Sequence, residues 1–332
     1  MHAISSIRSR SNFIVHNLRD VGYLGFGVFL ALYAQQSLYR LNMENCIGPD
    51  RLLRKPRYTA PPGAIDCHAH VFGPQARYPF SSTRNYTPED CTIEDYRSLL
   101  ASLGFSRGVI VQGGAHGIDN RVTLDAIATD PKHLRGVAVI NAGSSRTELE
   151  TLDRGGIRGV RLSSIVGDSF EQLEPLARDV HDLGWHLLFH FQTSSEMIEL
   201  ESVLTRIPNA FVLDHLGRIR AEESLNSSPY QCLLRLLDTD RCWIKLASLY
   251  RLSRESYPFL DMLPMIRDVV ARRPDRIIWG SNWPHPICPT PMPNDADLVD
   301  LIPIWLPDGD LQKQVLVKNP ETLYGFPEWP KL

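Results

Sequence analysis

Residues 64–70 read Ala64-Ile-Asp-Cys-His-Ala-His70, a short apolar run that ends in polar side chains. The same unit recurs along the rest of the chain: a run rich in Val and Ile, polar residues at its end, and then a longer stretch with helical periodicity. The expected strands are Ala64–His70, Gly108–Gly114, Leu134–Asn141, Ile157–Ser164, His186–Thr193, Ala210–Gly217, Cys242–Ser248 and Arg276–Asn282. Every strand is therefore expected to end in side chains that can carry chemistry.

The segments between these strands have the pattern of amphipathic helices, because Leu, Ile and Val recur at three- and four-residue spacing. The clearest examples are Thr92–Leu103, Ser169–Leu183, Ser195–Arg206 and Tyr257–Arg272. Strand alternating with helix eight times predicts an α/β fold, the closed parallel (β/α)8 or TIM barrel. An open doubly wound sheet is the alternative, but no GxGxxG sequence follows the first strand.

Composition indicates one large globular domain with an appendage. The chain has 332 residues, of which 43% are hydrophobic and 22% charged, so it can bury a substantial core. The 35 basic and 38 acidic residues give a net charge of −3 and are spread along the chain, which argues against a nucleic-acid partner. The 6 cysteines form no CxxC pair, so neither a disulfide framework nor a cysteine zinc site is expected.

Residues 1–60 differ from the rest and are predicted to be an N-terminal extension of a domain that spans 61–332. Three arginines and several serines precede an uncharged run at 21–39. A targeting segment, a membrane anchor at 21–39 and a non-structural or wrongly started stretch all remain open. The anchor is the weaker interpretation, because the most apolar part is shorter than the roughly 20 residues of a spanning helix. The domain is expected in the cytoplasm, and a mitochondrial or membrane-associated location follows only if residues 1–40 are genuine.

Histidines mark the ends of three expected strands. His68 and His70 are two residues apart on the first strand and so share one face, while His190 and His215 follow the fifth and sixth strands. Side chains at the C-terminal ends of barrel strands meet at the barrel mouth. Neutral imidazoles that converge there can bind a metal, or they can hydrogen-bond a carbonyl oxygen that becomes anionic when water attacks.

Four sequence motifs at the expected strand ends resemble the amidohydrolase-2 family. They are D-C-H-A-H at 66–70, G-V-R-L at 159–162, V-L-D-H-L-G-R at 212–218 and W-G-S-N-W-P-H-P at 279–286. The likeness covers about residues 62–326 and is greatest to the branch of 2-pyrone-4,6-dicarboxylate lactonases and related muconolactone and sugar-acid lactone enzymes. It implies that water attacks a lactone carbonyl, that an acid after the eighth strand is the base, and that strand histidines polarise the carbonyl.

The resemblance also implies roles for individual residues. The implied catalytic set is His68, His70, His190, His215 and Asn282, and the implied substrate contacts are Tyr86, Arg161, Arg251 and His285. Arginine suits the substrate role because its planar guanidinium grips a carboxylate at two points.

Two positions depart from the family pattern. Asn282 stands where the family has aspartate, and an amide cannot accept a proton near neutral pH. Three outcomes are open: another group such as His215, Asp214 or His285 becomes the base; the reaction is a non-hydrolytic lyase or isomerase step; or the site binds without turnover. The second departure is Gly167, where the dicarboxylate branch places another arginine.

The sequence therefore predicts a hydrolase that acts on a small carboxylated lactone or cyclic ester. The alternatives are a metal-dependent decarboxylase or lyase of an unsaturated or aromatic acid, and a catalytically silent binding protein. No cofactor is required by the first interpretation. A divalent metal, zinc, would be held by His68, His70 and His190. The expected partner is a small carboxylated molecule, and the sequence does not determine an oligomeric state.

Overall fold

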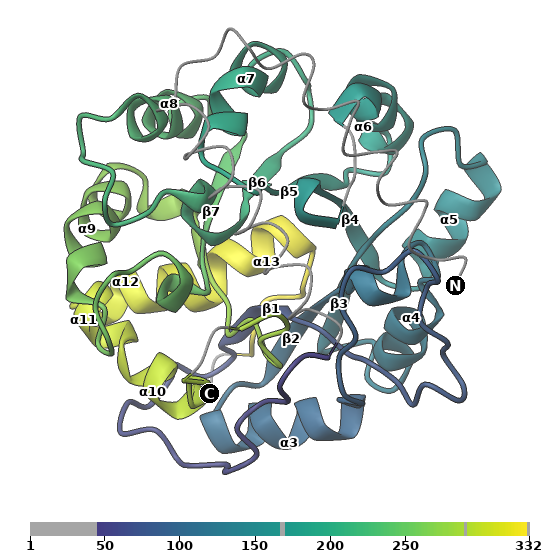
Figure 1. Cartoon of the computed structure of the whole chain (residues 1–332), viewed down its shortest axis with the longest axis horizontal. Coiled ribbons are helices and arrows are strands. Elements are labelled where there is room, and N and C mark those ends of the chain that lie inside the picture. Colours follow the sequence, from purple (N-terminus) through teal and green to yellow (C-terminus); the bar gives the residue numbers. More distant parts are fainter. Residues whose placement is uncertain (1–44, 167–169, 289–290, 331–332) are drawn as a thin grey trace, which may run out of the picture. The chain divides into compact units, whose positions relative to one another are not determined.

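The structure, a computed structural model, describes residues 45–166, 170–288 and 291–330, and its barrel belongs to a compact unit spanning Cys46–Leu332. Eight parallel strands follow one another in the order β1 to β8. They are β1 Ile65–Ala69, β2 Arg107–Val111, β3 Leu134–Ala138, β4 Ile157–Ser163, β5 His186–His190, β6 Phe211–Leu213, β7 Cys242–Leu246 and β8 Ile277–Trp279. The backbone N–H of His70 donates to the Trp283 carbonyl at 2.7 Å, which joins β1 to the chain after β8. The predicted (β/α)8 barrel is confirmed (Figure 1).

Helices surround the strands in the expected alternation (Figure 1). Those between strands are α3 Ile93–Leu103, α4 Arg121–Ala128, α5 Arg146–Arg154, α6 Leu173–His181, α7 Ser195–Leu204, α8 Ser228–Leu237 and α9 Leu263–Arg272. Those after β8 are α10 Asp295–Asp300, α11 Ile302–Trp305, α12 Gly309–Lys313 and α13 Asn319–Tyr324. The helix expected from Tyr257 begins later, at Leu263, because Pro258 and the left-handed backbone of Phe259 (φ 57°) interrupt it.

Local sequence explains where α3 begins and which face it buries. The Thr92 side chain accepts a hydrogen bond from the backbone N–H of Asp95, and the Asp95 carboxylate accepts one from the backbone of Thr92, which forms a capping box. Gly104 ends the helix in the left-handed conformation (φ 77°) that favours glycine. The side chains buried at helical spacing are Ile93, Tyr96, Leu99, Leu100 and Leu103. The helix is therefore fixed by its sequence at both ends before it packs on the sheet.

The barrel interior is filled with apolar side chains at its N-terminal end. This cluster consists of Ile65, Cys67, Val109, Val111, Val137, Leu188, Val212, Trp243, Ile278, Tyr324 and Phe326. Tyr324 and Phe326 come from the C-terminal end of the chain, where α13 lies across the barrel in Figure 1. Because this end is closed by packing, the polar side chains gather at the opposite, C-terminal end of the strands.

Asp66 lies on β1 between Ile65 and Cys67, whose side chains fill the barrel interior, so strand alternation turns its carboxylate outward. There the Asp66 carboxylate accepts hydrogen bonds from the hydroxyls of Tyr96 on α3, at 3.1 Å, and of Ser281, at 2.6 Å. The pairing of β1 with β2 becomes irregular only after Asp66, between Asp66 and Ala69. Burial raises the Asp66 pKa to about 6. Asp66 thus anchors the loop after β8.

Residues 46–60, which the sequence analysis placed in the extension, contact the barrel. The Asn294 side chain donates to the Asp50 carboxylate at 2.8 Å, and Arg57 pairs with Asp300 on α10 at 3.0 Å. The hydroxyl of Tyr58 donates to Gln312 on α12 at 2.9 Å. The predicted boundary near residue 60 therefore leaves a contacting segment outside the domain, and the candidate anchor at 21–39 lies outside the described residues.

We expect removal of residues 1–45 to leave the melting temperature unchanged, and removal of residues 1–60 to lower it. The second truncation removes the half-buried Tyr58 and its hydrogen bonds, which together contribute about 1–2 kcal/mol, whereas the exposed Arg57 pair contributes little. That loss corresponds to a few degrees in a chain of this size. Thermal unfolding of both truncated proteins measures the difference, and equal melting temperatures would show that residues 46–60 are dispensable.

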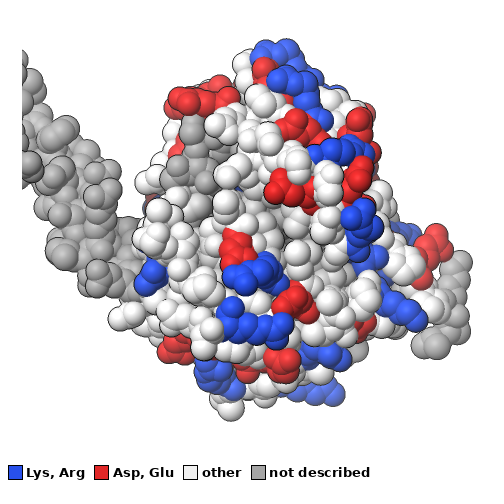
Figure 2. All heavy atoms as spheres, turned by 90° about the vertical axis from the view of Figure 1, so that its right-hand side faces the viewer, with Lys and Arg blue, Asp and Glu red and all other residues white. Residues whose placement is uncertain are grey.

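The described surface carries no single-sign charge field on the face that Figure 2 shows, where basic and acidic side chains are interspersed. Among the described residues, no helix combines the length and apolar character that crossing a membrane requires.

Candidate active site

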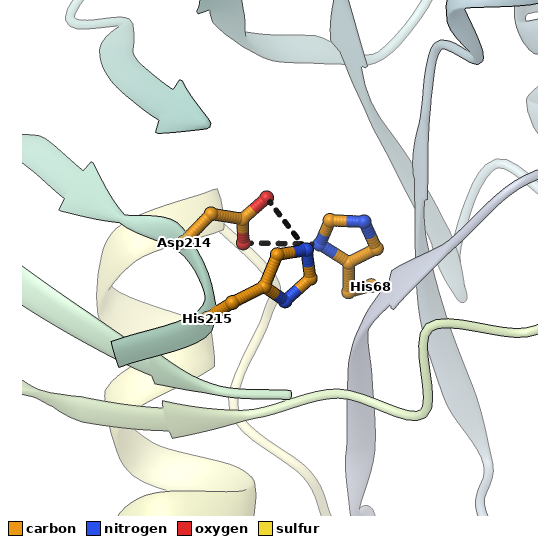
Figure 3. Close-up of side chains that lie close together, drawn as sticks. All are labelled: His68, Asp214 and His215. Carbon is orange, nitrogen blue, oxygen red and sulfur yellow. Dashed lines mark hydrogen bonds and ion pairs between the residues drawn. The ribbon is translucent and has the colours of Figure 1, made fainter. Parts of the chain in front are cut away.

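A buried cluster at the barrel mouth contains His68 from β1 and the pair Asp214 and His215 directly after β6 (Figure 3). His68 Nδ1 lies 3.1 Å from Asp214 Oδ1, and His215 Nε2 lies 3.8 Å from Asp214 Oδ2. His215 has a left-handed backbone (φ 50°), which is uncommon for a residue with a side chain and is typical of functional positions. The convergence of His68 and His215 predicted from the strand order is present.

Backbone carbonyls determine which ring nitrogen carries the proton in two of the histidines. His70 Nδ1 lies 2.8 Å from the Val111 carbonyl, and His215 Nδ1 lies 3.2 Å from the Ala247 carbonyl. A carbonyl oxygen only accepts, so in each neutral ring Nδ1 is the donor and Nε2 keeps its lone pair. Burial lowers the pKa of both imidazoles well below the ordinary value. Both rings are consequently neutral near pH 7.

Lys245 on β7 is a member of this cluster that the sequence analysis did not select. Its ammonium lies 3.3 Å from Asp214 Oδ1 and 3.2 Å from His68 Nδ1, and it is fully buried. Because His70 Nε2 carries no proton, His68 donates to it from its own Nε2 at 3.2 Å, and His68 Nδ1 then accepts from the ammonium of Lys245. Burial alone would raise the Asp214 pKa, but His68 and Lys245 hold it well below its usual range. A lysine inside the apolar run Cys242–Leu246 was the signal in the sequence.

The structure does not bring together the three histidines expected to hold zinc. Among the described residues, the group whose ligand atoms lie close enough for one ion is His68, Asp214 and His215. His70 and His190 are absent from it, and His190 Nδ1 contacts Arg161 and Ser163. Two imidazoles and a carboxylate are a common zinc set. Here, however, the Lys245 ammonium already lies against Asp214 and His68, so a divalent cation fits this group poorly.

Arg161 at the end of β4 is a buried guanidinium without an acidic partner. Its Nη2 donates to His190 Nδ1 at 2.7 Å and its Nη1 to the Gln112 carbonyl at 3.2 Å. Its side chain is 6% exposed, its Nε has no hydrogen-bond partner, and no carboxylate among the described residues lies within ion-pair distance of it. Because Arg161 can only donate, His190 Nδ1 accepts and His190 Nε2 carries the proton. The charge of Arg161 is therefore buried without a countercharge among the described residues.

A cavity of about 340 Å³ lies beside Arg161. Arg84 and Asn85 line it from the loop after β1, together with Ser163 from β4. Arg84 contacts the neutral oxygens of Thr87 and Ser81, which leaves its charge available to a ligand. Tyr86, the predicted substrate contact, is instead buried with its ring against Phe72, so its substrate role stays a prediction. Gly167 lies outside the described residues.

Asn282 belongs to a second polar cluster at the barrel mouth, next to His285. The Asn282 amide donates to the hydroxyl oxygen of Tyr250 at 3.0 Å, and that oxygen lies 3.0 Å from His285 Nδ1. His285 Nε2 lies 3.2 Å from an Asp295 oxygen. His285 was expected to touch substrate, but it is fully buried between Tyr250 and Asp295, which favours a supporting role. Tyr250 and Asp295 carry no motif that singles them out in the sequence.

Arg251, another predicted substrate contact, lies beside this second cluster. Its guanidinium is 5.7 Å from the ring centre of Tyr250, and its Nη2 donates to the Pro286 carbonyl. It therefore adds positive charge near Tyr250, and its contact with substrate stays a prediction.

A family model described as amidohydrolase matches residues 65–326, which are the whole barrel. The chain belongs to the amidohydrolase family. The resemblance seen in the four sequence motifs is thereby confirmed, and the protein is a hydrolase of this family.

Curated relatives cover nearly the same part of the chain. A 2-pyrone-4,6-dicarboxylate hydrolase from Comamonas testosteroni is 36% identical over 83% of this chain and 93% of its own length. A 4-sulfomuconolactone hydrolase from Rhizobium radiobacter is 36% identical over 84% and 96%. A D-galactarolactone isomerase from Agrobacterium fabrum is 32% identical over 81% and 93%.

A solved structure agrees with the barrel. It is a probable 2-pyrone-4,6-dicarboxylic acid hydrolase from Acinetobacter baumannii with citric acid bound, which is 28% identical, covers 80% of this chain and 100% of its own, and has a TM-score of 0.71. Fold and family are therefore established together.

Proposed function

We propose that this protein hydrolyses a small lactone that carries a carboxylate. The observation that carries the proposal is Arg161, a buried guanidinium without an acidic partner among the described residues, which lines a cavity and contacts His190. A carboxylate would supply the missing countercharge. The relatives named for lactones, and the citric acid in the solved relative, support a ligand of this class.

The proposed reaction uses the hydrogen-bond directions of Arg161, His190 and His215 described above. Arg161 holds the substrate carboxylate and at the same time fixes the His190 proton on Nε2. That N–H is a neutral donor for the lactone carbonyl oxygen, which becomes anionic when water attacks the carbonyl carbon. His215 keeps an unprotonated Nε2 atom that accepts a hydrogen bond from the attacking water. Arg84 offers a second positive contact for a substrate with two anionic groups.

Turnover is proposed to need no metal, because Lys245 supplies the positive charge beside Asp214 and His68. A metal bound to His68, Asp214 and His215 would supply a Lewis acid and a more acidic water at the same place. The two arrangements differ in their response to chelators.

Acid release from a panel of carboxylated lactones tests the proposed function. Opening a lactone with water creates a new carboxylic acid, so a pH-stat should record one proton per turnover. Activity that survives exhaustive chelation supports the metal-free arrangement, whereas activity that is lost and then restored by zinc would replace it with the metal arrangement. The absence of acid release from every lactone would contradict the hydrolase proposal.

A lactone isomerase is the second candidate, and Asn282 favours it. Moving an acyl group between two hydroxyls of one substrate consumes no water, so Asn282, which lacks the carboxylate that activates water, is compatible with a site that does not use water as its nucleophile. One relative is named an isomerase. Isomerisation changes the ring without releasing acid, so chromatography of the products in the same pH-stat runs separates the two activities.

Arg161→Lys should raise KM by about tenfold or more with a smaller loss of kcat. The ammonium of lysine keeps the charge but cannot make the two-point contact with a carboxylate in substrate and transition state alike. Arg161→Ala should raise KM further and lower kcat as well, because it also removes the donor that fixes the His190 tautomer. Steady-state kinetics on one carboxylated lactone measures both effects. An unchanged KM in both variants would show that Arg161 does not bind substrate.

A further inference from the structure

We infer that Tyr250 is the proton acceptor of this active site and stands in for the carboxylate that Asn282 lacks. The inference rests on the proposed function, because a proton acceptor is needed only if water or a substrate hydroxyl attacks a carbonyl. It depends on two contacts with one hydroxyl oxygen at the barrel mouth, one from Asn282 and one from His285.

The first contact is with Asn282. The amide nitrogen of Asn282 lies 3.0 Å from the Tyr250 hydroxyl oxygen and can only donate to it. A donor stabilises the deprotonated, anionic form of a phenol. An aspartate at position 282 would do the reverse, since a carboxylate accepts and would require Tyr250 to keep its proton. The departure from the family pattern therefore changes which of the two residues carries the negative charge.

The second contact is with His285, whose Nδ1 lies 3.0 Å from the same oxygen. Asp295 Oδ1 lies 3.2 Å from the other ring nitrogen. Both His285 and Asp295 are buried, whereas Tyr250 is only half-buried and lies in the turn Leu249–Arg251 directly after β7. Tyr250 is thus the least buried of three groups in the order acid, imidazole and hydroxyl, an order that activates a hydroxyl in other enzymes.

The charges around Tyr250 agree with this order. Burial raises the Tyr250 pKa, but His285 and Arg251 outweigh it and hold the Tyr250 pKa below its ordinary value, with the thiol of Cys288 acting in the opposite direction. Burial lowers the His285 pKa, yet Tyr250 and Asp295 raise it to about 9. The two groups therefore share a proton in the range above neutral pH.

His215 is a weaker candidate for the same task. Burial holds its pKa well below the ordinary value, so it is a poor proton acceptor near neutral pH. Asp214 is fully buried and paired with His68 and Lys245. Tyr250 is less buried than either of them, and its pKa is held below its ordinary value.

The step balances with Tyr250 alone. The phenolate oxygen takes one proton from water as the water oxygen bonds to the lactone carbonyl carbon and the carbonyl π electrons move to oxygen. The ring C–O bond then breaks as the carbonyl forms again, and the Tyr250 hydroxyl returns its proton to the leaving ring oxygen. Asn282, His285 and Asp295 are positioning residues, because they act through Tyr250.

The test compares Tyr250→Phe, Asn282→Asp and the double variant. Tyr250→Phe keeps the ring and should lower kcat by a hundredfold or more, the contribution of a general base. The double variant should regain most of that loss, with the acid limb of its pH profile moved toward the ordinary aspartate pKa of about 4. Tyr230→Phe is the matched control, because it removes a hydroxyl bonded to Asp268 on the helical layer, and it should leave kcat unchanged.

A second measurement needs no substrate. The near-ultraviolet phenolate band, recorded against pH, should contain one tyrosine that titrates below 10, and it should be missing in Tyr250→Phe and move to higher pH in Asn282→Asp. Full activity in Tyr250→Phe, or a loss that the double variant does not regain, would overturn the inference. Should no lactone be turned over by the unaltered protein, the proposed function fails, while the titration still decides whether Tyr250 is the acidic phenol.

Discussion

Lys245→Met should lower the free energy of unfolding by about 3–5 kcal/mol at pH 7, the largest effect on stability that we expect from one substitution. Methionine matches the length and apolar stem of lysine but leaves the fully buried Asp214 carboxylate without its ammonium partner. Removing one member of a buried ion pair costs this much because the remaining charge is neither solvated nor neutralised. Denaturant unfolding measures the change.

The pH dependence of this loss distinguishes a charge effect from a packing effect. In the unaltered protein the Asp214 pKa is held well below its ordinary value, so its contribution is present above about pH 4 and is lost as the pH falls further. In Lys245→Met the folded-state pKa of Asp214 should rise instead. The deficit should therefore be largest at pH 7 and shrink as the pH approaches 4.

The double variant Lys245→Met, Asp214→Asn is the matched control for this prediction. It removes both charges at once, so it should be more stable at pH 7 than Lys245→Met alone. A deficit that is equal at pH 4 and pH 7, and that the double variant does not reduce, would show that Lys245 matters for its packing only.

His190→Leu should lower kcat by roughly a hundredfold to a thousandfold, with a smaller effect on KM. Arg161 fixes the His190 proton on Nε2, and that N–H is the donor proposed for the carbonyl oxygen as it becomes anionic. Loss of one preorganised donor of this kind has an effect of this size. Steady-state kinetics on a carboxylated lactone separates the two constants.

His190→Gln provides the comparison, because the terminal amide of glutamine also offers an N–H donor. It should keep more activity than His190→Leu while unfolding at a similar denaturant concentration. Equal kcat in both variants, with unfolding unchanged from the unaltered protein, would mean that the donor at position 190 plays no part in turnover. Equal losses of kcat together with a lower denaturant midpoint in both variants would assign His190 to stability.

Periodicity and motif order were sufficient to predict the barrel. Each strand is a short apolar run and each helix has an amphipathic pattern, so local sequence determines the elements, and the eight-fold alternation then leaves one closed arrangement for a parallel sheet. The same order placed His68, His70 and His215 at one mouth, because parallel strands all end on the same side. The family could be recognised from the sequence because its four motifs lie at the ends of these strands.

Hydrogen-bond direction and partnership, in contrast, were decided only by the tertiary structure. Sequence spacing suggested a zinc set that included His190, but the guanidinium of Arg161 occupies the His190 Nδ1 atom. Asp66, two residues before His68 in the same motif, accepts hydrogen bonds from the hydroxyls of Tyr96 and Ser281 instead of joining the histidines.

The chain by itself therefore determined the fold, the family and the end of the barrel at which chemistry occurs, because these follow from patterns within each segment. It did not reveal that Lys245 pairs with Asp214, or that Tyr250 lies between Asn282 and His285. Those pairings join residues from different strands and loops at distances near 3 Å. Such distances depend on how the strands are staggered around the barrel and on how the loops pack, which no local pattern encodes.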